Sequence, residues 1–188
     1  MPRKIADIRR EEIVEALRGV VARDGLNVPS YDAIATEGEM SRQLVRHYYR
    51  SPDDMAADLA KRLTAELRAD VEQALDAADA SSRLEALVGV LFTRNIASDA
   101  GANDRNALEC ALHAIARHSS KVQEAFSAHL DAMRELIAGE LSGENAADRR
   151  VKAQAVATMA IGRNLPGSDP EALRQAAFTL LRVDLNGG

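Results

Sequence analysis

The sequence of 188 residues has no tryptophan, a single cysteine, and only three phenylalanines and three tyrosines. The lone Cys110 excludes an intrachain disulfide and a cysteine zinc cluster. No apolar run approaches ~18 residues and no charged-then-apolar leader opens the sequence, so we expect a soluble, cytoplasmic protein with no membrane partner. Glycine-rich phosphate loops and Gly-x-Ser-x-Gly are also missing, and we therefore predict no enzymatic activity and no cofactor.

The charge is acidic overall but unevenly distributed. The formal net charge is −5 at pH 7. Residues 1–50 carry nine Lys plus Arg against eight Asp plus Glu, whereas the remaining 138 residues carry 15 against 21. A nucleic acid would therefore have to bind a local basic patch within the first fifty residues.

The periodicity of the chain is helical. Strand signals are almost absent, and apolar residues recur at three- and four-residue spacing. Loops are expected at 98–104 and 142–148, and Ser168 and Glu171 have the spacing of a capping box. We predict an all-α fold of about nine helices, near residues 9–24, 30–37, 41–50, 52–75, 84–92, 105–118, 122–137, 148–164 and 173–181.

The fourth predicted helix has an unusual apolar stripe. Its members are spaced by four without exception: Met55, Leu59, Leu63, Leu67, Val71 and Leu75. Four residues turn a helix by about 400°, so the stripe drifts by roughly 40° at each step. We therefore expect the helix to contact the N-terminal module at its start and a different core further along.

Residues 39–54, "EMSRQLVRHYYRSPDD", hold a basic stretch without an acid between Arg42 and Arg50. A short helix, a tight turn at Gly38 and this basic helix form a helix-turn-helix candidate, whose second helix would enter the major groove of DNA. Arg pairs with guanine, Gln with adenine, and an apolar group contacts the thymine methyl. We predict base contacts from Arg42, Gln43 and Leu44, phosphate contacts from Ser30, Ser41, Arg46, His47, Tyr48 and Arg50, and inward packing of Met40, Val45 and Tyr49.

Residues 13–55 resemble the DNA-binding domain of the tetracycline-repressor (TetR) family. The residues that fit its pattern are Gly25, Ser30, Ile34, Ala35, Met40, Ser41, Tyr48, Tyr49, Ser51 and Met55. The resemblance implies an N-terminal three-helix DNA-binding domain, residues 1–52, and a C-terminal helical domain for ligand binding and dimerisation, residues 53–188. The match in the second domain is one of helix layout only.

Four positions depart from the family pattern. Glu39 occupies the turn position that is usually glycine, with Gly38 one place early, and Glu at positive φ would be strained. Gln43 replaces a glycine and Arg46 replaces a phosphate-binding tyrosine. Pro52 replaces a lysine, so one phosphate contact is missing unless Arg50 supplies it.

The C-terminal helices offer candidates for a pocket and an interface. Mostly apolar side chains of the predicted middle helices are expected to line a ligand pocket: Leu67, Val88, Phe92, Cys110, His113, Phe126, His129, Met133 and Met159. His129 is alternatively a hydrogen-bonded core residue, and the i, i+3 spacing of Cys110 and His113 is too weak to predict a metal site. Small residues on one face of each of the last two helices predict a dimer interface, for which internal packing is the alternative. The predicted interface residues are Ala153, Ala157, Ala160, Leu173, Ala176, Ala177 and Leu180.

These observations predict a homodimeric transcriptional regulator. By the family resemblance it is a repressor, released from a palindromic operator by a small, mostly apolar molecule. The alternative is an all-helical ligand-binding or protein-interaction module without DNA binding, which the departures at Glu39 and Pro52 would favour. A lyase or hydrolase would need an acid or base deep in the pocket, and none is obvious in the sequence.

Overall fold

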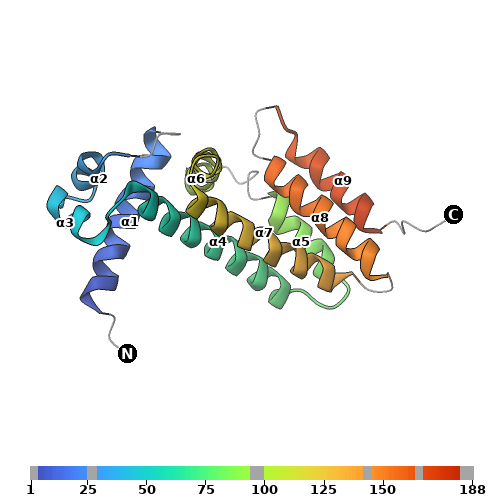
Figure 1. Cartoon of the computed structure of the whole chain (residues 1–188). Coiled ribbons are helices and arrows are strands. Elements are labelled where there is room, and N and C mark those ends of the chain that lie inside the picture. Colours follow the sequence, from blue (N-terminus) through green and yellow to red (C-terminus); the bar gives the residue numbers. More distant parts are fainter. Residues whose placement is uncertain (1–3, 25–28, 94–99, 142–144, 164–166, 183–188) are drawn as a thin grey trace. The chain divides into compact units, whose positions relative to one another are not determined.

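The computed structural model describes residues 4–24, 29–93, 100–141, 145–163 and 167–182 (Figure 1). These residues form nine α-helices and no strand, which confirms the all-α prediction. The helices are α1 (Ile5–Asp24), α2 (Tyr31–Glu37), α3 (Arg42–Tyr48), α4 (Pro52–Ala77), α5 (Arg83–Thr93), α6 (Ala100–Ala116), α7 (Ser120–Glu140), α8 (Ala146–Gly162) and α9 (Pro170–Arg182). None of them combines the length and apolar character that a membrane crossing requires.

Side-chain caps decide where several helices begin. Helix α8 starts two residues earlier than predicted, because Asn145 Oδ1 accepts hydrogen bonds from the amides of Ala147 and Asp148, both at 2.9 Å. The predicted capping box at Ser168 is wrong. Asp169 caps α9, with Oδ1 accepting the amide of Glu171 at 3.0 Å, because Pro170 takes the first helical position.

The predicted loop at 98–104 is also wrong in part. Helix α6 already begins at Ala100, and residues 98 and 99 lie outside the described residues. Glycine and asparagine in this stretch suggested a loop, but both residue types occur in helices at a modest cost of up to ~1 kcal/mol each.

The chain divides into two packing units, of which the first comprises residues 1–64 and 103–126. Helices α1, α2 and α3 pack against one another. The apolar side chains buried in this segment are Ile13, Val14, Leu17, Val20, Val21, Ile34, Val45 and Tyr49. The predicted DNA-binding segment 1–52 falls wholly within this unit, while the boundary at 52/53 stays a prediction.

The stripe on α4 behaves as its drift predicts. All six residues of the stripe are buried, and α4 is divided between the two units after Thr64. Met55, Leu59 and Leu63 belong to the first unit, whereas Val71 and Leu75 join the core of the second. The prediction that α4 contributes to two different cores is confirmed.

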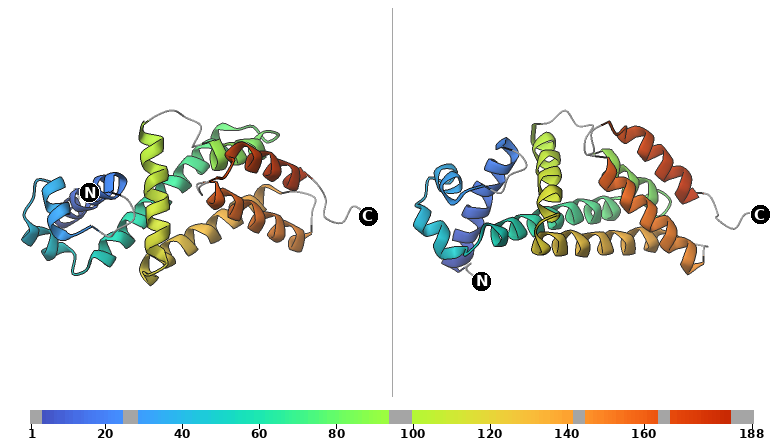
Figure 2. Two further views of the ribbon diagram at one scale, coloured as in Figure 1. Left: turned by 90° about the horizontal axis from the view of Figure 1, so that it is seen from above. Right: turned by 45° about the horizontal axis from the view of Figure 1, so that its top comes forward.

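The second unit comprises residues 65–102 and 127–188, and its core is formed by α4, α5, α7, α8 and α9. Helix α9 packs against both α5 and α8, as the two views of Figure 2 also show. Arg83 closes one side of this core: its Nε and Nη2 donate to Glu140 at 2.9 and 2.8 Å, and Nη1 donates to the carbonyl of Leu75 at 2.8 Å. The two bonds to Glu140, together with the charge of Arg83, hold the pKa of the Glu140 carboxyl below its usual range.

The small residues of α8 are inside this core. Ala153, Ala157 and Ala160, together with Ala177 of α9, are buried within one chain. Their burial within one chain supports internal packing, the alternative interpretation, and their place in a dimer interface stays a prediction. Ala176 is exposed, and Leu173 and Leu180 are partly buried, so these three predicted interface residues remain accessible.

Candidate nucleic-acid interface

Two serines set the starts of the helix-turn-helix segment. Ser30 caps α2, its Oγ accepting the amide of Ala33 at 3.2 Å, and Ser41 caps α3, its Oγ accepting the amide of Leu44 at 3.1 Å. Both serines are exposed. Because a capping hydroxyl accepts through its oxygen, its proton remains able to donate to another acceptor such as a phosphate.

The turn between α2 and α3 shows how Glu39 and Gly38 divide the roles of the usual turn glycine. Glu39 has φ 49°, so the residue that replaces the usual glycine keeps the left-handed conformation. Gly38 has φ −88° and is needed for space instead, since a Cβ there would lie 3.0 Å from Ala16 Cβ on α1 and 2.3 Å from Met40 Cε. The turn geometry is thus preserved, at a strain cost of ~1–2 kcal/mol for a non-glycine residue.

Helix α3 is anchored from its buried side. Val45 and Tyr49 are fully buried, as predicted, and the Tyr49 hydroxyl donates to Asp58 Oδ2 of α4 at 3.0 Å. Burial and the neighbouring Asp58 carboxylate raise the pKa of Tyr49 above its ordinary value. The guanidinium of Arg10 covers the ring at 5.3 Å from its centroid. One of the two adjacent tyrosines therefore anchors the helix, and Tyr48 is left half-exposed beside His47.

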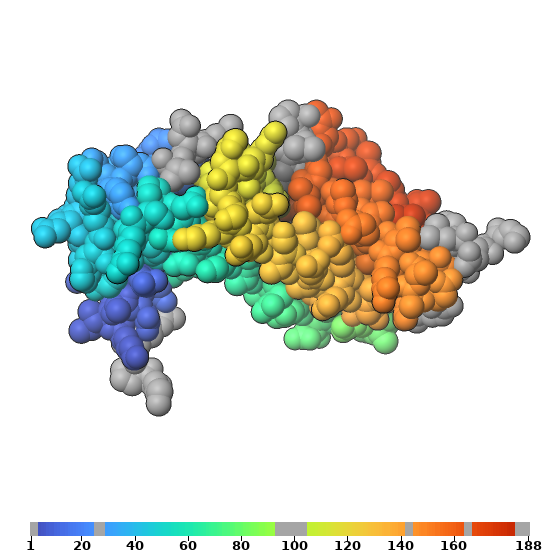
Figure 3. Space-filling model, in the orientation of Figure 1, coloured from blue at the N-terminus to red at the C-terminus, as the bar shows by residue number. Residues whose placement is uncertain are grey.

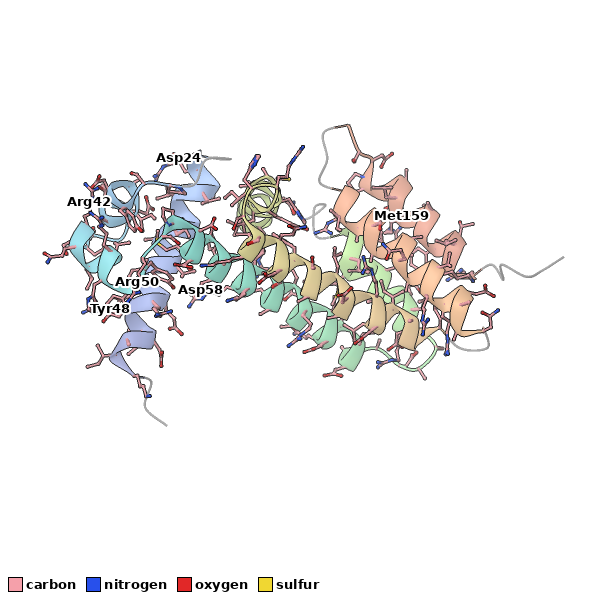
Figure 4. The ribbon with its side chains drawn as sticks, viewed as in Figure 1. Asp24, Arg42, Tyr48, Arg50, Asp58 and Met159 are labelled. Atoms are coloured by element: carbon pink, nitrogen blue, oxygen red, sulfur yellow. The ribbon has the colours of Figure 1, made fainter. Side chains whose placement is uncertain are left out.

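The opposite side of α3 is basic and open. Arg42, Gln43, Arg46 and His47 line a surface hollow of about 680 Å³. In the space-filling view, α2 and α3 form part of the outer surface of the first unit (Figure 3). Arg42 lies toward α2, and Tyr48 and Arg50 lie toward the other end of α3 (Figure 4). Long cationic side chains and an amide on one exposed helical face can bind phosphates and base edges.

Helix α2 supplies two partners that the sequence did not single out. Asp32 Oδ2 lies 3.1 Å from Arg42 Nη1. The ring of Tyr31 lies under the Arg46 guanidinium, 5.6 Å from its centroid, and the Tyr31 hydroxyl donates to the carbonyl of Tyr49 at 3.3 Å. All three tyrosines of the chain thus lie in the helix-turn-helix segment. Their concentration there, in a chain with few aromatic residues, was the sequence feature that could have indicated a role for Tyr31.

The start of α4 departs from the family pattern at Pro52, yet a lysine lies nearby. Lys121 of α7 hydrogen-bonds to Asp54 in the first turn of α4, and this bond lowers the pKa of Asp54. Its ammonium is engaged with that carboxylate. Arg50, the predicted substitute for the missing lysine, is exposed.

The predicted pocket residues fall into both packing units. Cys110, His113 and Phe126 belong to the first, where the His113 ring stacks on Phe126 at a centroid distance of 4.1 Å. The remaining six belong to the second: Leu67, Val88, Phe92, His129, Met133 and Met159. Among these, Val88, Phe92 and Met133 are buried in the core and Met159 packs against it. That they line one ligand pocket stays a prediction.

His129 is half-buried, and its assignment as a pocket residue, or alternatively as a hydrogen-bonded core residue, stays a prediction. His113 Nε2 lies 3.9 Å from the buried carboxylate of Glu109. Within the described part of the chain, no three His, Cys, Asp or Glu side chains are arranged to hold a metal ion.

Comparisons with known proteins identify the fold. No family model and no curated protein matches the sequence. Solved structures do match along nearly the whole chain. A transcriptional regulator from Rhodococcus sp. Rha1 is 22% identical with a TM-score of 0.76, covering 92% of this chain and 93% of its own. A TetR transcription regulator from Haloarcula marismortui is 17% identical with a TM-score of 0.78, covering 93% and 97%.

A third similar structure, a regulator from Saccharomonospora viridis in complex with choline, is 18% identical with a TM-score of 0.74 and covers 93% and 96%. At sequence identities this low, the structural similarity establishes the fold. The chain has the fold of the TetR-family transcriptional regulators.

Proposed function

We propose that this protein is a ligand-responsive, DNA-binding transcriptional regulator that binds a palindromic operator as a homodimer. The observation that carries the proposal is α3 itself. Its buried side is fixed by Val45 and Tyr49, and its open side presents Arg42, Gln43, Arg46 and His47 together. A short helix held in this way is the kind of element that reads the major groove.

The contacts divide by chemistry. Arg42 and Gln43 stand at the N-terminal end of α3, where side chains reach base edges, and half-buried Leu44 is the third proposed base contact. Arg46, His47, Tyr48 and Arg50 are proposed phosphate contacts, together with the capping hydroxyls of Ser30 and Ser41. A repressor acts where the DNA is, so the proposal includes a cytoplasmic location and no enzymatic activity.

The proposed dimer interface uses the outward side of α8 and α9. Val151 is 58% exposed although it is a large apolar residue in the middle of a charged stretch. Ala176 is exposed on α9, with Leu173 and Leu180 partly buried beside the core. Exposed small and apolar residues on two adjacent helices suit close packing against the same helices of a second copy.

The proposed effector is a small, mostly apolar molecule bound by the helical C-terminal part. The choline complex of a protein with this fold supports a small-molecule site in such a scaffold. Operator fits recognition helices separated by about one helical repeat of DNA, ~34–36 Å. A ligand that favours another separation lowers operator affinity by its differential binding free energy, typically ~1–3 kcal/mol.

The proposal is tested by selecting DNA from a random library with the purified protein and measuring its affinity for the enriched sequence. A palindromic consensus, bound far more tightly than random DNA of the same length, is the expected result. Failure to enrich any sequence would favour the alternative, a helical module without DNA binding. That alternative loses part of its support because Glu39 keeps the turn conformation that a glycine would have.

A further inference from the structure

Asp32 and Arg42 form an ion pair between the first turn of α2 and the first residue of α3. The carboxylate Oδ2 and the guanidinium Nη1 are 3.1 Å apart, and the two side chains are 64% and 55% exposed. An exposed pair of this kind contributes little to folding stability. The pair lies at the proposed base-reading end of α3, and we therefore consider its effect on DNA binding.

An acidic side chain is out of place on a surface that binds DNA. Any phosphate that reaches Arg42 comes close to the Asp32 carboxylate, well within the ~10 Å over which charges interact at ordinary salt. The repulsion acts on every DNA sequence. If Asp32 also improves a contact that forms only on the operator, that gain offsets the repulsion on the operator. On other DNA the repulsion remains and weakens binding.

The geometry of the guanidinium supplies such a benefit. Arginine has five N–H donors in a planar fork, and Asp32 engages one of its ends, Nη1. The carboxylate thus restricts the rotamer of Arg42 while leaving other donors of the fork for an acceptor pair such as guanine O6 and N7. Arg46, one turn further along α3, has no carboxylate partner of this kind in the described contacts and lies on the Tyr31 ring instead.

We propose that Asp32 is a positioning residue for operator specificity: it holds Arg42 for base reading and disfavours its contact with phosphate. The proposal rests on the proposed DNA-binding function. It predicts that removing the charge of Asp32 improves binding to random DNA more than binding to operator.

The test compares Asp32→Asn with Glu15→Gln, which removes an equally exposed acid on α1, 3.9 Å from Arg62. Dissociation constants are measured on the selected operator, its single-base variants and random DNA at several salt concentrations. Asp32→Asn should tighten binding to random DNA about two- to fivefold, because two unit charges ~4 Å apart in water interact by about 1 kcal/mol. It should also reduce the ratio of operator affinity to random-DNA affinity. Glu15→Gln should leave that ratio unchanged.

A second arm asks whether Asp32 acts through Arg42. In an Arg42→Ala background, Asp32→Asn should no longer alter preference among the single-base variants. An unchanged ratio of operator to random-DNA affinity in Asp32→Asn, or a change in base preference that persists in the Arg42→Ala background, would overturn the role of Asp32 while leaving DNA binding intact. A wild-type protein that selects no DNA sequence would overturn the proposed function and this inference together. Thermal melting of each variant checks that the fold is unchanged.

Discussion

The Tyr49 hydroxyl donates a hydrogen bond to the Asp58 carboxylate at 3.0 Å, joining the end of α3 to the second turn of α4. Tyr49 is almost fully buried, and its backbone carbonyl accepts the hydroxyl of Tyr31 from α2. A single residue therefore connects α2, α3 and α4. The orientation of α3 in the first unit depends on this junction.

Tyr49→Phe removes the hydroxyl and keeps the ring. We expect the free energy of unfolding to fall by about 1 kcal/mol, the usual net value of a hydrogen bond. Tyr49→Ala also removes the ring and should cost ~3–5 kcal/mol through the cavity. Urea unfolding of the three proteins measures both losses. Equal losses in the two variants would contradict the assigned roles of ring and hydroxyl.

The same hydroxyl predicts an alkaline dependence of stability. The pKa of Tyr49 is raised in the folded state, by burial first and by the Asp58 carboxylate second. Its stabilising contribution is fully present below the unfolded pKa of tyrosine, ~10, and is lost as pH rises from there through the folded value. Wild type should therefore lose stability above pH ~10 more steeply than Tyr49→Phe, as thermal melts across that range would reveal. Parallel curves would count against the buried hydroxyl.

Glu39→Gly should stabilise the protein. The left-handed conformation of Glu39 costs ~1–2 kcal/mol, and glycine relieves it at an entropy cost of ~0.5–1 kcal/mol. The difference is an expected gain of up to about 1.5 kcal/mol in the free energy of unfolding, which urea unfolding measures. A loss of stability would mean that the Glu39 side chain makes a compensating interaction.

Gly38→Ala should have the opposite effect, because the new Cβ would press against Ala16 of α1 and Met40. We expect a loss of ~1–3 kcal/mol, as for other overpacked sites. Gly139→Ala on α7 is the matched control, since a Cβ there meets no heavy atom within 4 Å among the described residues. It should be neutral or stabilising, as alanine is in helices. Similar melting shifts in both variants would refute the steric argument at Gly38.

The sequence predicted those parts of the fold that local periodicity and chemistry determine. The four-residue stripe on α4 required two partners whatever the remaining chain does, and the capping serines of α2 and α3 act within their own helices. The capping box at Ser168 failed because Asp169, as good a cap as serine and followed by proline at the first helical position, competes one residue later.

The rest depends on packing between segments. Small residues at helical spacing indicate close approach but not which neighbour approaches, and for Ala153 and Ala157 it is the chain's own core. The Asp32–Arg42 ion pair could not be predicted from the sequence either. An acid in the first turn of a helix already has a sufficient explanation in the helix dipole, so nothing local indicated its partner on α3.

Ala176→Arg and Ala177→Arg separate the proposed interface from the core. Ala176 is exposed in one chain, so the arginine should leave the fold intact and prevent dimer formation by charge and bulk. Ala177 is fully buried, and an arginine there should cost several kcal/mol and unfold the second unit. Sedimentation together with thermal melting distinguishes the two. A folded Ala176→Arg protein that stays dimeric would refute an interface at this face of α9.

The most direct test of the account measures Gln43→Ala and Arg46→Ala on operator, single-base variants and random DNA over a range of salt. Gln43→Ala should cost ~1–3 kcal/mol on operator and relax preference at one base pair. Arg46→Ala should weaken binding about equally on all sequences and reduce the slope of log affinity against log salt by ~1, because one fewer phosphate is neutralised. Uniform loss in Gln43→Ala with altered base preference in Arg46→Ala would contradict the orientation of α3, and wild-type affinity in both would contradict DNA binding through this helix.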